Sequence, residues 1–201
     1  MKSGADSFRQ MHPEKGAGII MSENTKKTGK SNTSMSTKKM ALCAVFIACA
    51  VVGSMFSIPV LGSRCSPVQH LVNILCAVFL GPWYGLAAAF LASLLRNMLG
   101  LGTLLAFPGS MCGALLSGLL YRWLKKLPAA WLGELFGTSI IGGLLAYPVA
   151  AFIMGNSAAA LFAYIIPFMI SSGGGTIIAA IVTAALKKSG FLANAQAQMN
   201  A

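Results

Sequence analysis

Apolar residues run almost without interruption from Met40 to Leu186, and the few breaks are short and contain glycine, proline or charge. The runs between breaks are too long and too continuous for the strands of a membrane barrel. A helix satisfies its own backbone hydrogen bonds in lipid, so helices are expected. The pattern predicts an all-α integral membrane protein, a bundle of six transmembrane helices at about 39–60, 67–80, 82–98, 103–124, 130–153 and 160–186.

Local signals mark several of these boundaries. Ser66 followed by Pro67 is typical of an N-cap and a first helical position, and the pair Gly81 and Pro82 ends one helix and begins the next. The second helix is then about 14 residues long and spans roughly 21 Å, which is less than the ~30 Å of a bilayer core. We therefore expect its outer end to be recessed.

Charge gives the orientation. Only 9% of the 201 residues are charged and the net charge is +11, whereas soluble domains carry about 25% charged residues. If six helices alternate, only Arg64 and Arg96 lie on one side, and the other side holds the remaining basic residues near helix ends: Lys38, Lys39, Arg122, Lys125, Lys126, Lys187 and Lys188. This asymmetry predicts that both termini are cytoplasmic, and it explains the basic character without nucleic acid.

The chain divides into three parts by composition. Residues 1–37 are rich in Ser, Thr, Lys, Gly and Asn and are expected to form a disordered basic tail. Residues 38–188 form the membrane domain, and residues 189–201 form a C-terminal tail. Small residues recur four apart within the membrane domain, which favours close helix packing, at Ala44 and Ala48, Ala88 and Ala92, Gly109 and Gly113, and Gly133 and Gly137.

Catalytic chemistry is scarce in the membrane domain. Of the four acidic residues in the chain, only Glu134 lies there. Metal-dependent enzymes need clustered carboxylates or histidines, and no phosphate-binding loop or G-x-S-x-G turn is present. A serine hydrolase based on His70 is formally possible, but we expect no enzyme activity, no metal and no bound cofactor.

Polar and aromatic residues gather at the expected outer ends of the helices. Gln69, His70 and Asn73 share one face of the second helix because they are three and four residues apart. Aromatic faces combined with a few hydrogen-bonding groups suit a small aromatic or heteroaromatic solute. The candidate substrate-binding residues are Gln69, His70, Asn73, Arg96, Asn97, Thr103, Phe107, Tyr147, Tyr164, Phe168 and Ser171.

Several of these residues have a purely structural alternative. Arg96 is long enough to reach the outer interface, and His70 is placed to cap a helix or bind a backbone carbonyl. Tyr147 and Tyr164 are also typical interfacial aromatics. Glu134 either balances its helix N-terminus and the lysines before it, or makes a deep polar contact or a contact with a partner subunit.

Four blocks of the sequence resemble one family. They are SPVQHLVNILCAVFLGPWYG (66–85), LLRNMLGLGTLLAFPGSMCGALLSGLLYR (94–122), GELFGTSIIGGLLAYPVA (133–150) and PFMISSGGG (167–175). They are similar to the ThiW family of substrate-binding S components of energy-coupling factor (ECF) transporters, which is associated with the thiazole precursor of thiamine. The resemblance covers about residues 38–187.

The resemblance implies a six-helix S-component fold in a prokaryotic cytoplasmic membrane, with hydroxyethylthiazole bound near the extracellular face. It also implies a partner transmembrane (T) subunit and two cytoplasmic ATPases that use the ATP. In such S components an alanine motif of the first helix docks on the T subunit, and Ala44 and Ala48, with Ala41 one turn earlier, match it. The loop at 61–66 is expected to act as a lid. Another thiamine-related or heteroaromatic solute, a membrane enzyme and an assembly subunit without ligand remain the alternatives.

Overall fold

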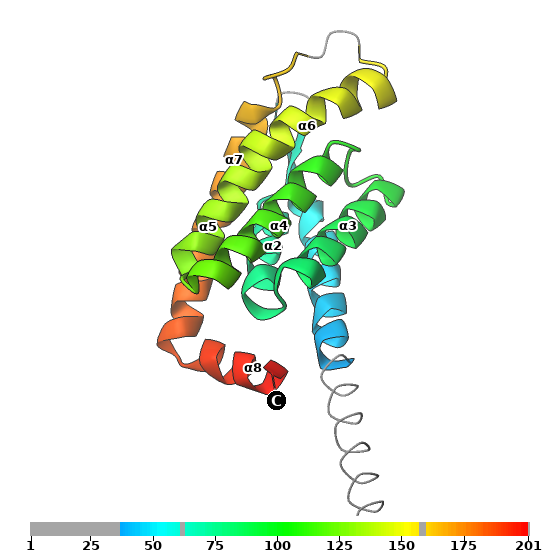
Figure 1. Cartoon of the computed structure of the whole chain (residues 1–201). Helices are drawn as coiled ribbons and strands as arrows, with labels where there is room; N and C mark the ends of the chain where they lie inside the picture. Colours follow the sequence, from blue (N-terminus) through cyan, green and yellow to red (C-terminus); the bar gives the residue numbers. More distant parts are fainter. Residues whose placement is uncertain (1–36, 61–62, 157–159, 201) are drawn as a thin grey trace, which may run out of the picture.

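The computed structural model describes residues 37–60, 63–156 and 160–200, so the tail predicted at 1–37 lies outside it except for Thr37. The described residues form helices and one two-stranded hairpin (Figure 1). In chain order these are a first helix, Thr37–Phe56, whose last turn is 3-10 (Ser54–Phe56), β1 (Ile58–Val60), β2 (Ser63–Cys65), α2 (Pro67–Phe79), α3 (Pro82–Met98), α4 (Ala106–Leu124), α5 (Leu127–Phe136), a π-helical segment (Gly137–Gly142), α6 (Gly143–Pro148), a second π-helical segment (Val149–Ile153), α7 (Ile165–Lys188) and α8 (Phe191–Asn200).

Prolines explain most of the differences from the predicted boundaries. The first helix ends at Phe56 rather than near residue 60, because the residues before Pro59 are extended and pair in β1. The long fifth helix begins earlier, at Leu127, with Pro128 in its first turn, and α7 begins later, at Ile165, with Pro167 in its first turn. Proline is well tolerated in a first turn because that N–H has no helical partner.

Three of the described helices are long and apolar enough to cross a membrane: Thr37–Phe56, Leu127–Ile153 and Ile165–Lys188. Large apolar side chains are exposed on their outer faces, including Val52, Phe152 and Ile177. In water such faces would be unfavourable, so lipid is the solvent that fits them. α2 has only 13 residues, about 20 Å, and the count of six spans stays a prediction.

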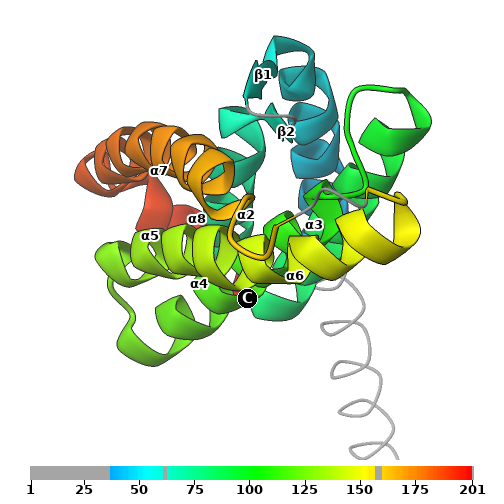
Figure 2. The ribbon, with the colours of Figure 1, turned by 90° about the horizontal axis from the view of Figure 1, so that it is seen from above.

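α2 is the central element of the bundle. It packs against α3, α4, α5 and α7, and Figure 2 shows it between α7 and α3 when the bundle is viewed from above. Ser66 and Pro67 take the predicted N-cap and first-turn positions, although the Ser66 side chain makes no capping hydrogen bond. The polar first turns of α2 are therefore enclosed by neighbouring helices rather than exposed.

Glycines let the long helix α5–α6 lie directly against α4. A Cβ atom on Gly137 would lie 2.7 Å from the carbonyl oxygen of Cys112, and a Cβ atom on Gly142 would lie 2.6 Å from the Cα atom of Gly109. Both distances are too short for any side chain. The small-residue spacing that the sequence shows at 109–113 and 133–137 thus serves helix packing, as predicted.

The C-terminal segment is more ordered than its composition suggests. Residues 189–201, expected to be a tail, include α8, which lies across the end of the bundle opposite the β-hairpin (Figure 1). Leu192 and Met199 are seven residues apart on one face of α8, and both are buried. The Nε2 atom of Gln196 donates hydrogen bonds to the Val78 carbonyl at 2.8 Å and to the Tyr121 hydroxyl at 3.0 Å.

Candidate functional site

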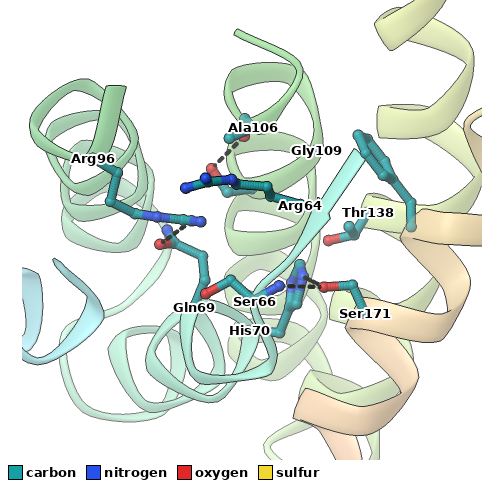
Figure 3. Close-up of a pocket in the computed structure, with 11 residues that line it drawn as sticks. Arg64, Ser66, Gln69, His70, Arg96, Ala106, Gly109, Thr138 and Ser171 are labelled. Carbon is teal, nitrogen blue, oxygen red and sulfur yellow. Dashed lines mark hydrogen bonds between the residues drawn. The ribbon is translucent and has the colours of Figure 1, made fainter. Parts of the chain in front are cut away.

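A polar pocket lies where the hairpin meets the adjacent ends of α2, α3, α4 and α7 (Figure 3). Its cavity volume is about 30 Å³, which is room for about two waters and well below the ~300–1,000 Å³ typical of ligand pockets. Its walls are Arg64, Ser66, Gln69, His70, Arg96, Ala106, Gly109, Ser110, Thr138, Phe168 and Ser171.

The hairpin that covers this pocket is tied to α7. The backbone N–H of Ser66 donates to Oγ of Ser171 at 3.0 Å, and the thiol of Cys65 donates to the Pro167 carbonyl at 3.4 Å. Cys65 lies outside the membrane-spanning helices, and burial raises the pKa of its thiol. These contacts hold β2 and the start of α2 against the first turns of α7.

His70 connects the pocket to the interior of the bundle. Its Nδ1 atom lies 2.8 Å from Oε1 of Glu134, and its Nε2 atom lies 3.1 Å from Oγ of Ser171. The carboxylate favours a proton on Nδ1. With a neutral ring, Nε2 accepts from the Ser171 hydroxyl, whose oxygen in turn accepts from Ser66. The predicted alternative, in which His70 caps a helix or binds a backbone carbonyl, is therefore wrong.

Glu134 is completely buried behind the pocket. Besides His70, its Oε1 atom accepts hydrogen bonds from Asn73 Nδ2 at 2.9 Å and from Thr138 Oγ1 at 3.1 Å. Gly113 provides the space, since a Cβ atom there would lie 2.8 Å from both carboxylate oxygens. Of the alternatives for Glu134, the structure supports the deep polar contact, because no part of the side chain reaches the surface.

Two arginines lie at the outer side of the pocket. Arg96 is only 2% exposed, and its Nη1 atom donates to Gln69 Oε1 at 3.0 Å. It therefore does not reach out to an interface. Arg64 on β2 donates from Nη1 to the Gly100 carbonyl at 3.1 Å. Figure 3 shows the two guanidinium groups pointing toward one another across the pocket.

Comparison of the sequence with models of known protein families shows to which family the chain belongs. A model described as thiamine-precursor transporter protein (ThiW) matches residues 40–189, which is most of the chain. The chain belongs to the ThiW family. No curated protein matches it significantly. Family membership confirms the resemblance drawn from the sequence and identifies a transporter of the membrane.

The pocket of this ThiW chain brings together five of the eleven candidate residues from the sequence: Gln69, His70, Arg96, Phe168 and Ser171. They come from α2, α3 and α7, and the sequence predicted that these residues lie together at the outer ends of their helices. Phe168 is the one Phe, Tyr or Trp among the described lining residues. The expected mixture of several aromatic faces is therefore reduced to a single ring.

The other six candidates lie outside the pocket lining. Asn73 lies below it, bonded to Glu134 and to the Ser110 carbonyl at 3.2 Å. Asn97 holds the α3–α4 loop through the carbonyls of Ser93 at 2.8 Å and Thr103 at 3.1 Å. The ring of Phe107 packs against that of Phe90 at a centroid distance of 5.7 Å. Tyr164 packs in the apolar cluster of Leu105 and Ala146. Tyr147 and the loop residue Thr103 do not line the pocket either.

Sequence reasoning missed four polar residues of the ThiW pocket. Arg64 was used as a topology signal and Ser66 as a helix cap, and both face the pocket because the hairpin folds over it. Ser110 and Thr138 carry no distinguishing signal in their apolar helices. Thr138 lies in the π-helical segment Gly137–Gly142, and such segments often mark functional sites. This feature is visible in the structure and not in the sequence.

The lining can bind polar ligands but offers little for a metal. In the part of the chain that the structure describes, no group of three His, Cys, Asp or Glu side chains is arranged to hold a metal ion. The acidic side chain nearest the pocket, Glu134, is engaged behind it by three donors. What remains toward the cavity is a set of hydrogen-bond donors, two positive charges and one aromatic ring.

Proposed function

We propose that this chain is the substrate-capture S component of an ECF-type importer that takes up hydroxyethylthiazole, the thiazole precursor of thiamine. The observation that carries the proposal is the buried polar pocket at one end of the bundle, covered by the β-hairpin, in a chain of the thiamine-precursor transporter family. The positive-inside pattern of the basic residues supports an extracellular position for this end. Capture there is the first step of uptake.

The pocket offers complementary groups for a small heteroaromatic alcohol. The ring of Phe168 supplies an aromatic face, and His70 and Ser171 supply hydrogen-bonding groups that match a ring nitrogen or a hydroxyl. A ligand of about nine heavy atoms with up to ~1.5 kcal/mol per atom is large enough for nanomolar affinity. Because the space is narrow, we expect the hairpin and the arginine side chains to move when the ligand enters.

Energy for uptake is proposed to come from partner subunits. The sequence has no phosphate-binding loop, and an importer of this type uses ATP on a pair of cytoplasmic ATPases. Ala41, Ala44 and Ala48 are all exposed on the first helix. This small-residue face is suited to close packing against a T subunit within the membrane.

Calorimetric titration of the detergent-purified chain tests the proposal, with hydroxyethylthiazole, hydroxymethylpyrimidine and thiamine as ligands. Selective binding of the thiazole supports it. Preference for one of the other two solutes supports an S component with a different thiamine-related substrate. If the folded chain binds none of the three, the assignment of hydroxyethylthiazole as the substrate fails.

One observation favours a second candidate, a membrane hydrolase. Ser171, His70 and Glu134 are hydrogen-bonded in the order of a serine hydrolase triad, at 3.1 Å and 2.8 Å. Ser171 lies within α7, however, and not on a strained turn that exposes a nucleophile. A hydrolase would convert an ester analogue, and Ser171→Ala would abolish the conversion. Recovery of every bound ligand unchanged excludes this candidate.

A further inference from the structure

Some buried polar atoms around the pocket lack a hydrogen-bond partner within the protein. Among the described residues, three buried side-chain atoms of the lining have no hydrogen-bond partner: Nε of Arg96, Nε2 of Gln69 and Oγ of Ser66. All three can donate a hydrogen bond. Buried donors are nearly always paired in proteins, and leaving one unpaired costs about 1–3 kcal/mol. Three such donors in one pocket call for shared acceptors there, which ordered water or the oxygens of a ligand can supply.

The charges around the pocket are also unbalanced. Arg64 and Arg96 both line it, and none of the described lining residues is acidic. Glu134 lies behind the pocket and, among the described residues, forms no ion pair with either arginine, while its buried Oε2 atom has no hydrogen-bond partner. Arg96 is almost fully buried, and a buried charge without a counter-ion is strongly unfavourable. An anionic group in the pocket would remove this imbalance.

We propose that the ligand captured by this site carries an anionic oxygen group, a phosphate monoester or a carboxylate, on its heteroaromatic ring. Arg96, Gln69 and Ser66 bind the oxygens, Arg64 closes over them from the hairpin, and the ring packs beside Phe168. This inference rests on the proposed capture function and replaces the neutral alcohol with an anionic thiazole derivative as its ligand. It places the charged end of the ligand toward β2 and the ring toward α7.

A neutral alcohol fits the same atoms less well. One hydroxyl oxygen accepts at most two hydrogen bonds, whereas the pocket presents three unpaired donors and a second guanidinium group. A carboxylate or phosphate offers two or three oxygens to these donors. Guanidinium groups bind such oxygens in pairs, through short charge-assisted hydrogen bonds.

The test compares matched ligands on the full-length chain in detergent. The probes are hydroxyethylthiazole, its phosphate monoester and a thiazole carboxylic acid of similar length, each titrated by calorimetry, with inorganic phosphate as a competitor. We expect at least one anionic probe to bind about tenfold or more tightly than the alcohol. Which anion binds more tightly identifies the group, and competition by inorganic phosphate supports recognition of a phosphate itself.

Variants assign the preference to named residues. Arg96→Gln and Arg64→Gln should each lower the ratio of anion affinity to alcohol affinity severalfold, and Arg96→Lys should retain only part of it because an ammonium group cannot bind two oxygens side by side. Arg122→Gln, at an exposed arginine far from the pocket, is the matched control and should leave the ratio unchanged. Arg64 is exposed, so its variant remains informative even if the Arg96 variants fold poorly.

Two results overturn the inference and are distinguishable. If the alcohol binds as tightly as both anions, or more tightly, the anionic substrate is wrong while thiazole capture stands. If the wild-type chain elutes as a folded monodisperse protein and binds none of the probes, the capture function fails together with it.

Discussion

Glu134 and His70 are 64 residues apart in the sequence, and their side chains meet at 2.8 Å inside the bundle. The contact joins α5 to α2 and orients the imidazole ring, so that the Nε2 atom faces Ser171 and the pocket. The position of a pocket residue is thereby set by a carboxylate that the ligand never needs to touch. A carboxylate in such a role should affect both stability and binding.

The first prediction concerns this pair. His70→Ala leaves Glu134 buried without its main partner, and Glu134→Ala leaves three donors unpaired, so each should lower the free energy of unfolding by about 3 kcal/mol or more. The loss in free energy of unfolding of the double variant should be smaller than the sum of the two single losses by about 1–2 kcal/mol. Denaturant titration in detergent measures these values.

A pair of distant residues provides the control for this double-mutant cycle. Thr183 bonds Trp131 and lies away from the pocket, so His70→Ala and Thr183→Ala should be additive within about 0.5 kcal/mol. Additivity for His70 and Glu134 as well would contradict the coupling seen in the structure.

The second prediction uses glycines. Gly113→Ala would bring a methyl group to 2.1 Å from Thr138 Oγ1 and 2.8 Å from the Glu134 carboxylate, so it should destabilise the protein by about 1–3 kcal/mol through overpacking. Gly173→Ala is the matched control, because nothing lies within 4 Å of its Cβ position. We expect the melting temperature to fall for the first variant and to stay or rise for the second. Equal effects would show that Glu134 has more room than the structure gives it.

The helices of this fold were largely predictable from sequence, and the pocket was predictable only in part. Long apolar runs and prolines carry the signal for helix position, which is why α2 and α3 agree with the prediction within a residue. Helix rotation leaves no comparable signal in an apolar chain. Thr138 and Ser110 face the pocket while Tyr147 and Phe107 do not, and this depends on packing between distant segments.

The hairpin and α8 were missed for different reasons. Only three residue pairs define the hairpin, between Ile58 and Cys65, and so short a strand gives no readable alternation. α8 has only three large apolar residues, Phe191, Leu192 and Met199, and its docking depends on contacts such as Gln196 with Val78 that sequence patterns do not encode. In both cases tertiary contacts, rather than local preference, determine the structure.

A third prediction tests whether the hairpin closes the pocket. In a variant whose other cysteines are alanine, Cys65 should react slowly with a maleimide, because it is only 5% exposed and burial raises the pKa of its thiol. The reactive species is the thiolate, so labelling should accelerate as pH rises toward that raised pKa. Pro59→Cys with Cys65→Ser is the exposed control and should react about tenfold faster. Equal rates would mean that the hairpin opens freely, and replacement of residues 61–66 by a Gly/Ser linker would then leave ligand dissociation unchanged.

The fourth prediction concerns the first helix. Ala48→Trp places a large side chain on the exposed alanine face, so it should reduce co-purification with the T and ATPase subunits, and ATP-driven uptake, by tenfold or more, while calorimetric ligand binding persists. Ile177→Trp, at an exposed position on α7, is the control and should co-purify normally. Normal uptake by the Ala48 variant would move the partner surface away from this helix.

The unpaired donors of Arg96, Gln69 and Ser66 also allow the ligand to be found by an unbiased screen. A ligand that accepts from these donors binds the folded chain and not the unfolded one, and at 100 times its dissociation constant it stabilises the folded state by about 2.7 kcal/mol. Melting temperatures measured against a library of small heteroaromatic acids, phosphate esters and alcohols would therefore rank ligands directly. The same buried donors that bind the substrate would thus make its binding measurable as a rise in melting temperature.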